Sequence, residues 1–260
     1  MSLLRFALFY LRANFQIALE YRVSFWAQVF AMVVNDAMWI FFWGLFFQRF
    51  PTVQGYGFQD VVMLWSVTAL AFGLTAGLCG NAWRFGAQVA QGELDFYLAL
   101  PKPVLLHVMV SGMTVSAWGD VLFAVGMFCA LVRPDPGHLA LFLLLAATSA
   151  AIMTAYAVAV NSLAFWLGQA DGLAREFVSA LLIFSTYPGV LFTGAVKVLL
   201  FTVIPAGFVA YIPVELLRRW DWSLASLLVA VTAATALGAR FVFNAGLRRY
   251  ESGNLLAMRA

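Results

Sequence analysis

The sequence has very little charge. Only 10% of its 260 residues are Asp, Glu, Lys or Arg, whereas 64% are hydrophobic. A soluble domain is typically about a quarter charged and about half apolar. The composition therefore excludes an ordinary soluble domain and predicts an all-α integral membrane protein.

Lysine is almost absent, and this bears on energy coupling. The chain has only Lys102 and Lys197, and neither lies in a GxxxxGK[ST] phosphate-binding loop. The sequence therefore predicts no ATP hydrolysis by this chain in that manner. If ATP drives the protein, the ATPase is a separate polypeptide.

Metal-ligating and catalytic residue types are equally scarce. Cys79 and Cys129 have no metal or redox spacing, and His107 and His138 are far apart. We predict no metal site, no cofactor and no catalytic residues in this chain. The net charge of +3 comes from basic residues at the ends of apolar runs, not from a basic patch, so no nucleic-acid partner is expected.

Long apolar runs dominate the chain, and a helix needs roughly 20 apolar residues to cross a membrane. Six spans are predicted, at about 23–47, 60–79, 104–132, 139–167, 177–192 and 224–247. The third run is longer than one span needs and is interrupted by AWGD at 117–120, where Asp120 is expected to cap a helix.

The segment 196–217 is apolar but holds Pro205, Gly207 and Pro213, so it is either a seventh span or a re-entrant element. Positive charge favours the cytoplasmic side of membrane proteins. Six spans with a cytoplasmic N-terminus place ten basic residues inside and five outside, whereas seven spans give eight and seven. We therefore predict six spans, a re-entrant external element at 193–223, and an exit gate at Pro205, Gly207 and Pro213.

The N-terminal segment 1–22 is predicted to form an amphipathic helix in the membrane interface. Arg5, Arg12, Gln16 and Glu20 fall within about 80° of one another on a helical wheel. Its arginines are spread along the segment, unlike those of a cleavable signal peptide.

A polar insert at 84–103 separates the second and third apolar runs. Arg84, Gln88 and Gln91 have helical spacing, Gly92 interrupts them, and Pro101 and Pro103 stiffen the entry to the next run. Paired acids beside Leu94, Phe96 and Tyr97 are suited to docking on another protein. From spacing alone, a solvated loop is an equally good interpretation.

The chain resembles permease subunits of the ATP-binding-cassette type-2 exporter superfamily, in its six-span bacterial branch. Four features carry the resemblance: the basic N-terminal helix, GELDFYLALPKPV after the second span, the region 196–217, and the tail FNAGLRRYESGN at 243–254. The resemblance implies that 84–103 is a coupling element that docks on an ATPase subunit. The implied contact residues are Glu93, Leu94, Asp95, Phe96 and Tyr97, joined by Arg84 and Gln88.

The resemblance also implies the partners and the location. These are ATPase subunits that hold ATP and Mg, a second identical or related permease subunit, and the bacterial inner membrane, with both termini and the tail 248–260 in the cytoplasm. The substrate is expected to be hydrophobic or amphipathic. A stand-alone carrier and a non-transport scaffold are the alternatives, although the sequence shows no inverted repeat of the kind many carriers have.

Several polar and aromatic residues inside the spans are candidates for lining a substrate path. Asn35 and Asp36 lie near the middle of the first span, where a lipid-facing acid costs at least ~2.5 kcal/mol. The alternatives are a buried hydrogen-bonded packing contact or a protonated carboxyl for Asp36, helix packing for Asn161, a proline kink for Tyr187, and interfacial belts or helix packing for the tryptophans. The candidates are Asn35, Asp36, Trp39, Trp43, Asn161 and Tyr187.

Gly73 and Gly77 form a GxxxG pair in the second span. Such pairs allow helices to approach closely. The sequence leaves dimerisation and packing within the chain as equal possibilities.

Overall fold

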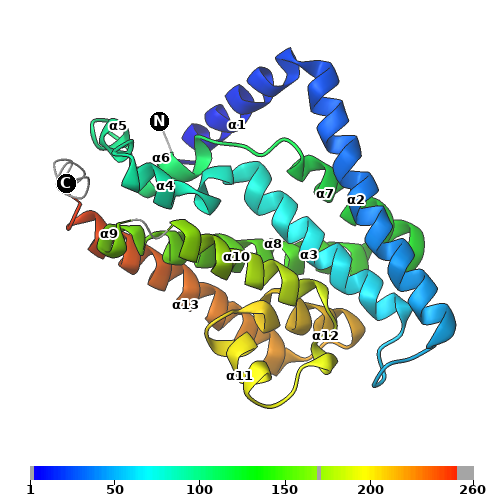
Figure 1. Ribbon diagram of the computed structural model, residues 1–260. Helices are drawn as coiled ribbons and strands as arrows, with labels where there is room; N and C mark the ends of the chain where they lie inside the picture. Colours follow the sequence, from blue (N-terminus) through cyan, green and yellow to red (C-terminus); the bar gives the residue numbers. More distant parts are fainter. Residues whose placement is uncertain (1–2, 169–170, 251–260) are drawn as a thin grey trace.

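The computed structural model describes residues 3–168 and 171–250, and the regular elements in these ranges are helices (Figure 1). Within this part of the chain, four helical segments are long and apolar enough to cross a membrane. They are α2 (Arg22–Arg49), α3 (Phe58–Leu78), α8 with α9 (Pro136–Asn161 and Ala164–Leu167), and α13 (Trp222–Leu247). The prediction of an all-helical membrane protein is confirmed.

The helix α3 forms the centre of the bundle. In the most apolar stretch of α3, 83% of the residues are buried, compared with 17% in α2 and in α13. The outer helices α2 and α13 therefore present apolar side chains, such as Phe30 and Phe241, away from the protein core.

Close packing of α3 against α7 (Ala117–Met127) depends on two glycines. A Cβ atom at Gly73 would lie 2.7 Å from Cγ2 of Val121, and one at Gly77 would lie 3.3 Å from the ring of Trp118. The GxxxG pair thus serves packing within the chain.

The third apolar run is broken earlier than predicted. It forms α6 (Val104–Val110), an irregular stretch at 111–116, and α7, which continues as a π-helical turn, Phe128–Val132. The interruption expected at 117–120 is instead the first turn of α7, and Asp120 lies inside that turn and not at the cap position. Backbone groups of the true break are paired, because Gly112 O accepts from Gly80 N and Thr114 N donates to Ala76 O.

The helix α10 (Asp171–Thr186) is also displaced from the predicted run at 177–192. It ends at Thr186 because Tyr187 precedes Pro188, and a residue before proline disfavours helical backbone. A short 3₁₀ turn, Gly189–Leu191, follows.

The segment 196–217 is bent. Helix α11 (Gly194–Thr202) meets the following pair, a π-helical turn (Gly207–Tyr211) and α12 (Ile212–Arg218), at an angle of 78°. Pro205 lies in the break, and Pro213 lies in the first turn of α12, where its missing N–H is tolerated.

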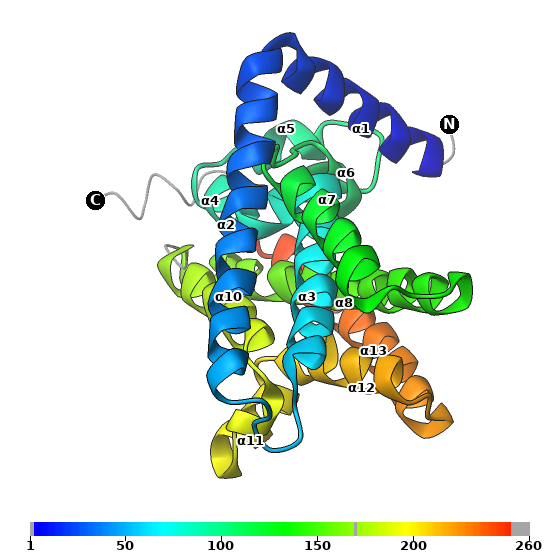
Figure 2. The same ribbon diagram turned by 90° about the vertical axis from the view of Figure 1, so that its right-hand side faces the viewer.

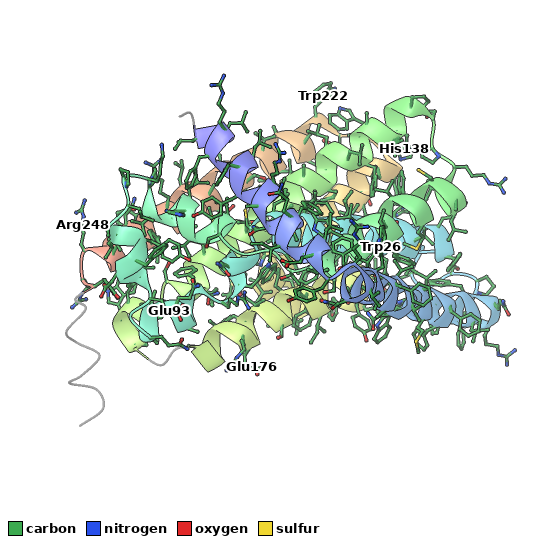
Figure 3. All side chains as sticks on the ribbon, turned by 90° about the horizontal axis from the view of Figure 1, so that it is seen from above. Trp26, Glu93, His138, Glu176, Trp222 and Arg248 are labelled. Carbon is green, nitrogen blue, oxygen red and sulfur yellow. The ribbon has the colours of Figure 1, made fainter. Side chains whose placement is uncertain are left out.

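The elements separate into two ends (Figures 1 and 2). At one end α1 (Leu3–Glu20), α4 (Phe85–Ala90), α5 (Leu94–Leu98) and α6 gather, together with α9 and the last turns of α13. The loop 50–57, α11 and α12 lie at the other end. Figure 3 shows Glu93 and Arg248 on one side of the molecule and His138 and Trp222 on the other.

Candidate functional site

The predicted coupling element consists of two short helices, α4 and α5, joined at Gly92. This glycine has a φ of +78°, a left-handed conformation that most residues adopt only with strain. The turn is closed by a hydrogen bond of 3.0 Å from Glu93 N to Gln88 O. The predicted interruption at Gly92 therefore redirects the chain into α5.

The five predicted contact residues divide between two faces of α5. Glu93 and Asp95 are exposed, and Phe96 is 64% exposed, whereas Leu94 is fully buried and Tyr97 is 9% exposed. Leu94 and Tyr97 pack inside the chain, so they hold α5 in place and are not available to a partner. The available surface is acidic and aromatic, and exposed Leu98 extends it.

Tyr97 anchors α5 through a chain of hydrogen bonds. Its hydroxyl lies 2.9 Å from Oγ of Ser111 in the break before α7. Nδ2 of Asn81 donates to the same Oγ over 2.9 Å, and Nε of Arg84 donates to Oδ1 of Asn81 over 3.2 Å. Arg84 thus has an internal partner, and α5 is connected to the 3₁₀ turn after α3 (Gly80–Trp83) and to the break before α7.

The N-terminal helix is attached to the same element. The hydroxyl of Tyr10 hydrogen-bonds Nε2 of His107 on α6, and the rings of Phe6 and His107 are 5.0 Å apart. His107 also contacts the ring of Tyr97 at 5.1 Å. His107 on α6 therefore contacts both α1 and α5.

The end of α13 completes this surface. Tyr250 packs on Phe165 and lies near the carboxylate of Asp95. Burial, and then the neighbouring Asp95 carboxylate, raise the pKa of Tyr250 to about 12. The predicted tail continues to 260, but 251–260 lies outside the described residues.

Asn161 does not line a path. It is 1% exposed, and its side chain accepts from Gly86 N over 3.2 Å and donates to the carbonyls of Ala157 and Ala82. The prediction that Asn161 lines a substrate path is therefore wrong, because its side chain is buried and its amide group bonds backbone groups within the chain. Asn161 joins the start of α4 to α8.

Replacing Asn161 with alanine is expected to loosen this joint. The change leaves the buried Gly86 N–H without that acceptor, which typically costs about 1–3 kcal/mol. We expect a lower melting temperature for Asn161→Ala in detergent and no change for Asn244→Ala, which removes an exposed amide on α13. Equal melting temperatures for the two variants would contradict this role.

The remaining path candidates separate into two places. Asp36 is 3% exposed and, with exposed Asn35, lines a cavity of about 200 Å³ between α2, α3, α7 and α10. Trp39 stacks on Trp65, another lining residue, with ring centroids 5.7 Å apart. Trp43 and Tyr187 pack on each other at 6.0 Å and do not line this cavity.

Asp120 was not among the predicted path candidates. It was expected to cap a helix, yet it lines the same cavity as Asp36. The only sequence signal was an acid within an apolar run, and nothing local indicated a pair across two helices.

The gate candidates lie at the opposite end from α5. Pro205, Gly207 and Pro213 are buried, and of the three only Pro205 lies in the break between α11 and the following helices. None of them lines the adjacent cavity of about 200 Å³, which includes Lys197 and Glu215. The bent segment is tied to the bundle by Arg218, whose Nε lies 3.0 Å from Oδ1 of Asp60 at the start of α3.

These features define a class: a polytopic helical membrane protein with the short helices α4 and α5 at one end and the bent pair of α11 and α12 at the other. A family model described as "ABC-2 family transporter protein" matches residues 33–253. The match covers most of the sequence, and the chain belongs to this family. Comparison with curated proteins gives no match, and comparison with solved structures gives none. The resemblance to type-2 permeases is thus confirmed, and permeases of this family generally work with an ATPase partner.

Proposed function

We propose that this chain is the membrane-spanning subunit of an ATP-driven exporter in the bacterial inner membrane. ATP and Mg are held by separate ATPase subunits, and a second permease subunit completes the path. The observation that carries this proposal is that α5 has one exposed face and one buried face. Glu93, Asp95 and Phe96 are exposed, whereas Leu94 and Tyr97 pack against the bundle.

The proposed topology has six spans. Besides the four long apolar segments, α7 with its π-helical turn (Ala117–Val132) and α10 cross as shorter helices. The pair α11 and α12 enters and leaves on the outer side, and its 78° bend supports a re-entrant element. The ends of α5 and α13 are then cytoplasmic, and α1 lies in the membrane interface.

Force would travel from the ATPase through named contacts. Movement of α5 pulls on Ser111 and Asn81 through Tyr97, and therefore on α7 and α3. The joint from α4 to α8 moves with it through Asn161. Such a rigid-body shift of packed helices would convert an inward-open path into an outward-open one.

Reversing the two exposed acids tests the docking surface. Glu93→Lys with Asp95→Lys is expected to reduce recovery of the ATPase with the purified chain by about tenfold or more, because like charges at an interface repel strongly. Membrane insertion and melting temperature should not change, since both side chains are exposed. The readout is mass spectrometry of the complex purified from native membranes in mild detergent.

The control variant is Asp135→Asn, which removes an exposed acid from the loop before α8, away from α5. Asparagine still caps α8, where Asp135 now accepts from Gly137 N and His138 N. Full ATPase recovery with the reversed variant would reject docking through α5. Transport by the reconstituted chain without nucleotide would instead establish a stand-alone carrier.

A further inference from the structure

Two acids meet inside the membrane region, on helices that are far apart in sequence. Asp36 of α2 and Asp120 of α7 are each 3% exposed, and both line the same cavity of about 200 Å³. Nδ2 of Asn35 approaches Oδ1 of Asp36 at 3.5 Å. Among the described residues, no donor reaches Oδ2 of either aspartate.

The cavity walls supply no positive charge. The residues that line the cavity in the described part of the chain come from α2, α3, α7 and α10, and none of them is Lys, Arg or His. Two carboxylates without a counter-ion in a low-dielectric region are strongly unfavourable. The pair is therefore expected to take up one or two protons, or to hold a cation from outside the chain.

The walls of the cavity favour an organic cation over a metal ion. Trp65, Phe72 and Leu182 provide aromatic and apolar surface beside the two acids. Hard metal ions require six or more oxygen ligands or ordered water, whereas the described residues contain no group of three or more His, Cys, Asp or Glu that could hold a metal. Ammonium groups bind well between carboxylates and aromatic faces.

The size of the cavity restricts the ligand to a headgroup. Its volume of about 200 Å³ is below the range of typical drug-sized pockets, which begins at about 300 Å³. A primary ammonium group with a few carbons fits this volume, while a longer apolar tail would have to extend out of the cavity toward lipid.

We propose that Asp36 and Asp120 form a binding site for the ammonium headgroup of a cationic amphipathic molecule. Asn35 lies beside the acids, and Trp65 and Phe72 contact the first carbons of the tail. The site stands on the cavity and its acids; its assignment as a substrate site rests on the proposed export function.

The test measures binding of radiolabelled n-octylammonium to the protein in lipid nanodiscs without nucleotide. Saturable binding is expected for the native chain. We expect a loss of about tenfold or more in affinity for Asp36→Asn and for Asp120→Asn. The control Glu176→Gln, an exposed acid on α10, should bind like the native chain. Octanol and octanoate, which match the tail but lack the ammonium group, should not displace the label.

A second measurement needs no variant. A hydrophobic carbodiimide should modify Asp36 or Asp120 in the native chain. The quaternary n-octyltrimethylammonium, which cannot form an amide with an activated carboxyl group, should protect them, but octanol should not, as read by peptide mass spectrometry. Equal binding by the aspartate variants, or equal protection by octanol, would overturn the proposal and leave a proton-sharing packing contact. If acid-dependent binding persists but no ATP-driven transport is found, the export function fails and the site stands.

Discussion

Leucine at Gly119 is expected to prevent α2 from packing against α7 and to remove most of the folded protein. A Cβ atom at this position would lie 2.5 Å from the carbonyl oxygen of Val29 and 2.7 Å from Cβ of Met32. Neither atom is the free end of a flexible side chain, so the two helices have to separate. Overpacking a core typically lowers the free energy of unfolding by about 1–3 kcal/mol and occasionally by more. We expect a loss of about 3 kcal/mol or more for Gly119→Leu.

Gly126 provides a matched control on the same helix. It lies about two turns further along α7 on the same face, yet a Cβ there would have no described atom within 4 Å apart from its chain neighbours and the nearby backbone of α7. A groove between α2 and α7 has opened at this level, with Ala37 and Ile40 on one wall and Leu122 on the other. Gly126→Leu should therefore fold normally.

Size-exclusion yield and melting temperature in detergent distinguish the two variants. We expect a large loss for Gly119→Leu and little change for Gly126→Leu. Similar yields and melting temperatures for both would show that α2 and α7 are not held at the distance described. Because Gly119 is adjacent to Asp120, the same close approach brings Asp120 to Asp36.

Removing Arg218 is expected to release the bent segment from α3. Besides the contact with Asp60, Nη1 of Arg218 lies 3.5 Å from Oε2 of Glu215, and its guanidinium lies 5.0 Å from the centre of the Tyr56 ring. The arginine side chain is 34% exposed, so solvent weakens these attractions. We expect Arg218→Gln to lower the free energy of local opening by about 1 kcal/mol, which is roughly a fivefold rise in amide exchange of peptides from 207–218.

Arg219→Gln is the control, because this exposed neighbour carries the same charge at the same end of α12. The double variant of Arg218→Gln with Asp60→Asn tests the pair directly. The new asparagine side chain would still accept from Gly57 N, as Asp60 now does over 2.8 Å, so the start of α3 is preserved. If the free-energy changes from Arg218→Gln and Asp60→Asn simply add in the double variant, Arg218 does not hold the segment through Asp60. The same conclusion follows if Arg219→Gln raises amide exchange as much as Arg218→Gln does.

The sequence determined the class of the protein and the position of its long spans. Runs at 23–47, 60–79, 139–167 and 224–247 correspond to α2, α3, α8 with α9, and α13. The bend around Pro205 and the turn at Gly92 could also be predicted from the sequence. Hydrophobicity, length, proline and glycine act locally, so they can be read without knowing the neighbours of a residue.

The tertiary structure alone decided the roles of the polar residues. Asp36 and Asp120 are 84 positions apart in the sequence. They line one cavity because Gly119 lets α2 pack closely against α7. Leu94 and Tyr97 belong to the core because α5 packs against α6. The Asn161 side chain accepts a hydrogen bond from the backbone of α4. A buried polar group must find its partner wherever the fold provides one. That partner is set by helices that are distant in sequence, and no local pattern records it.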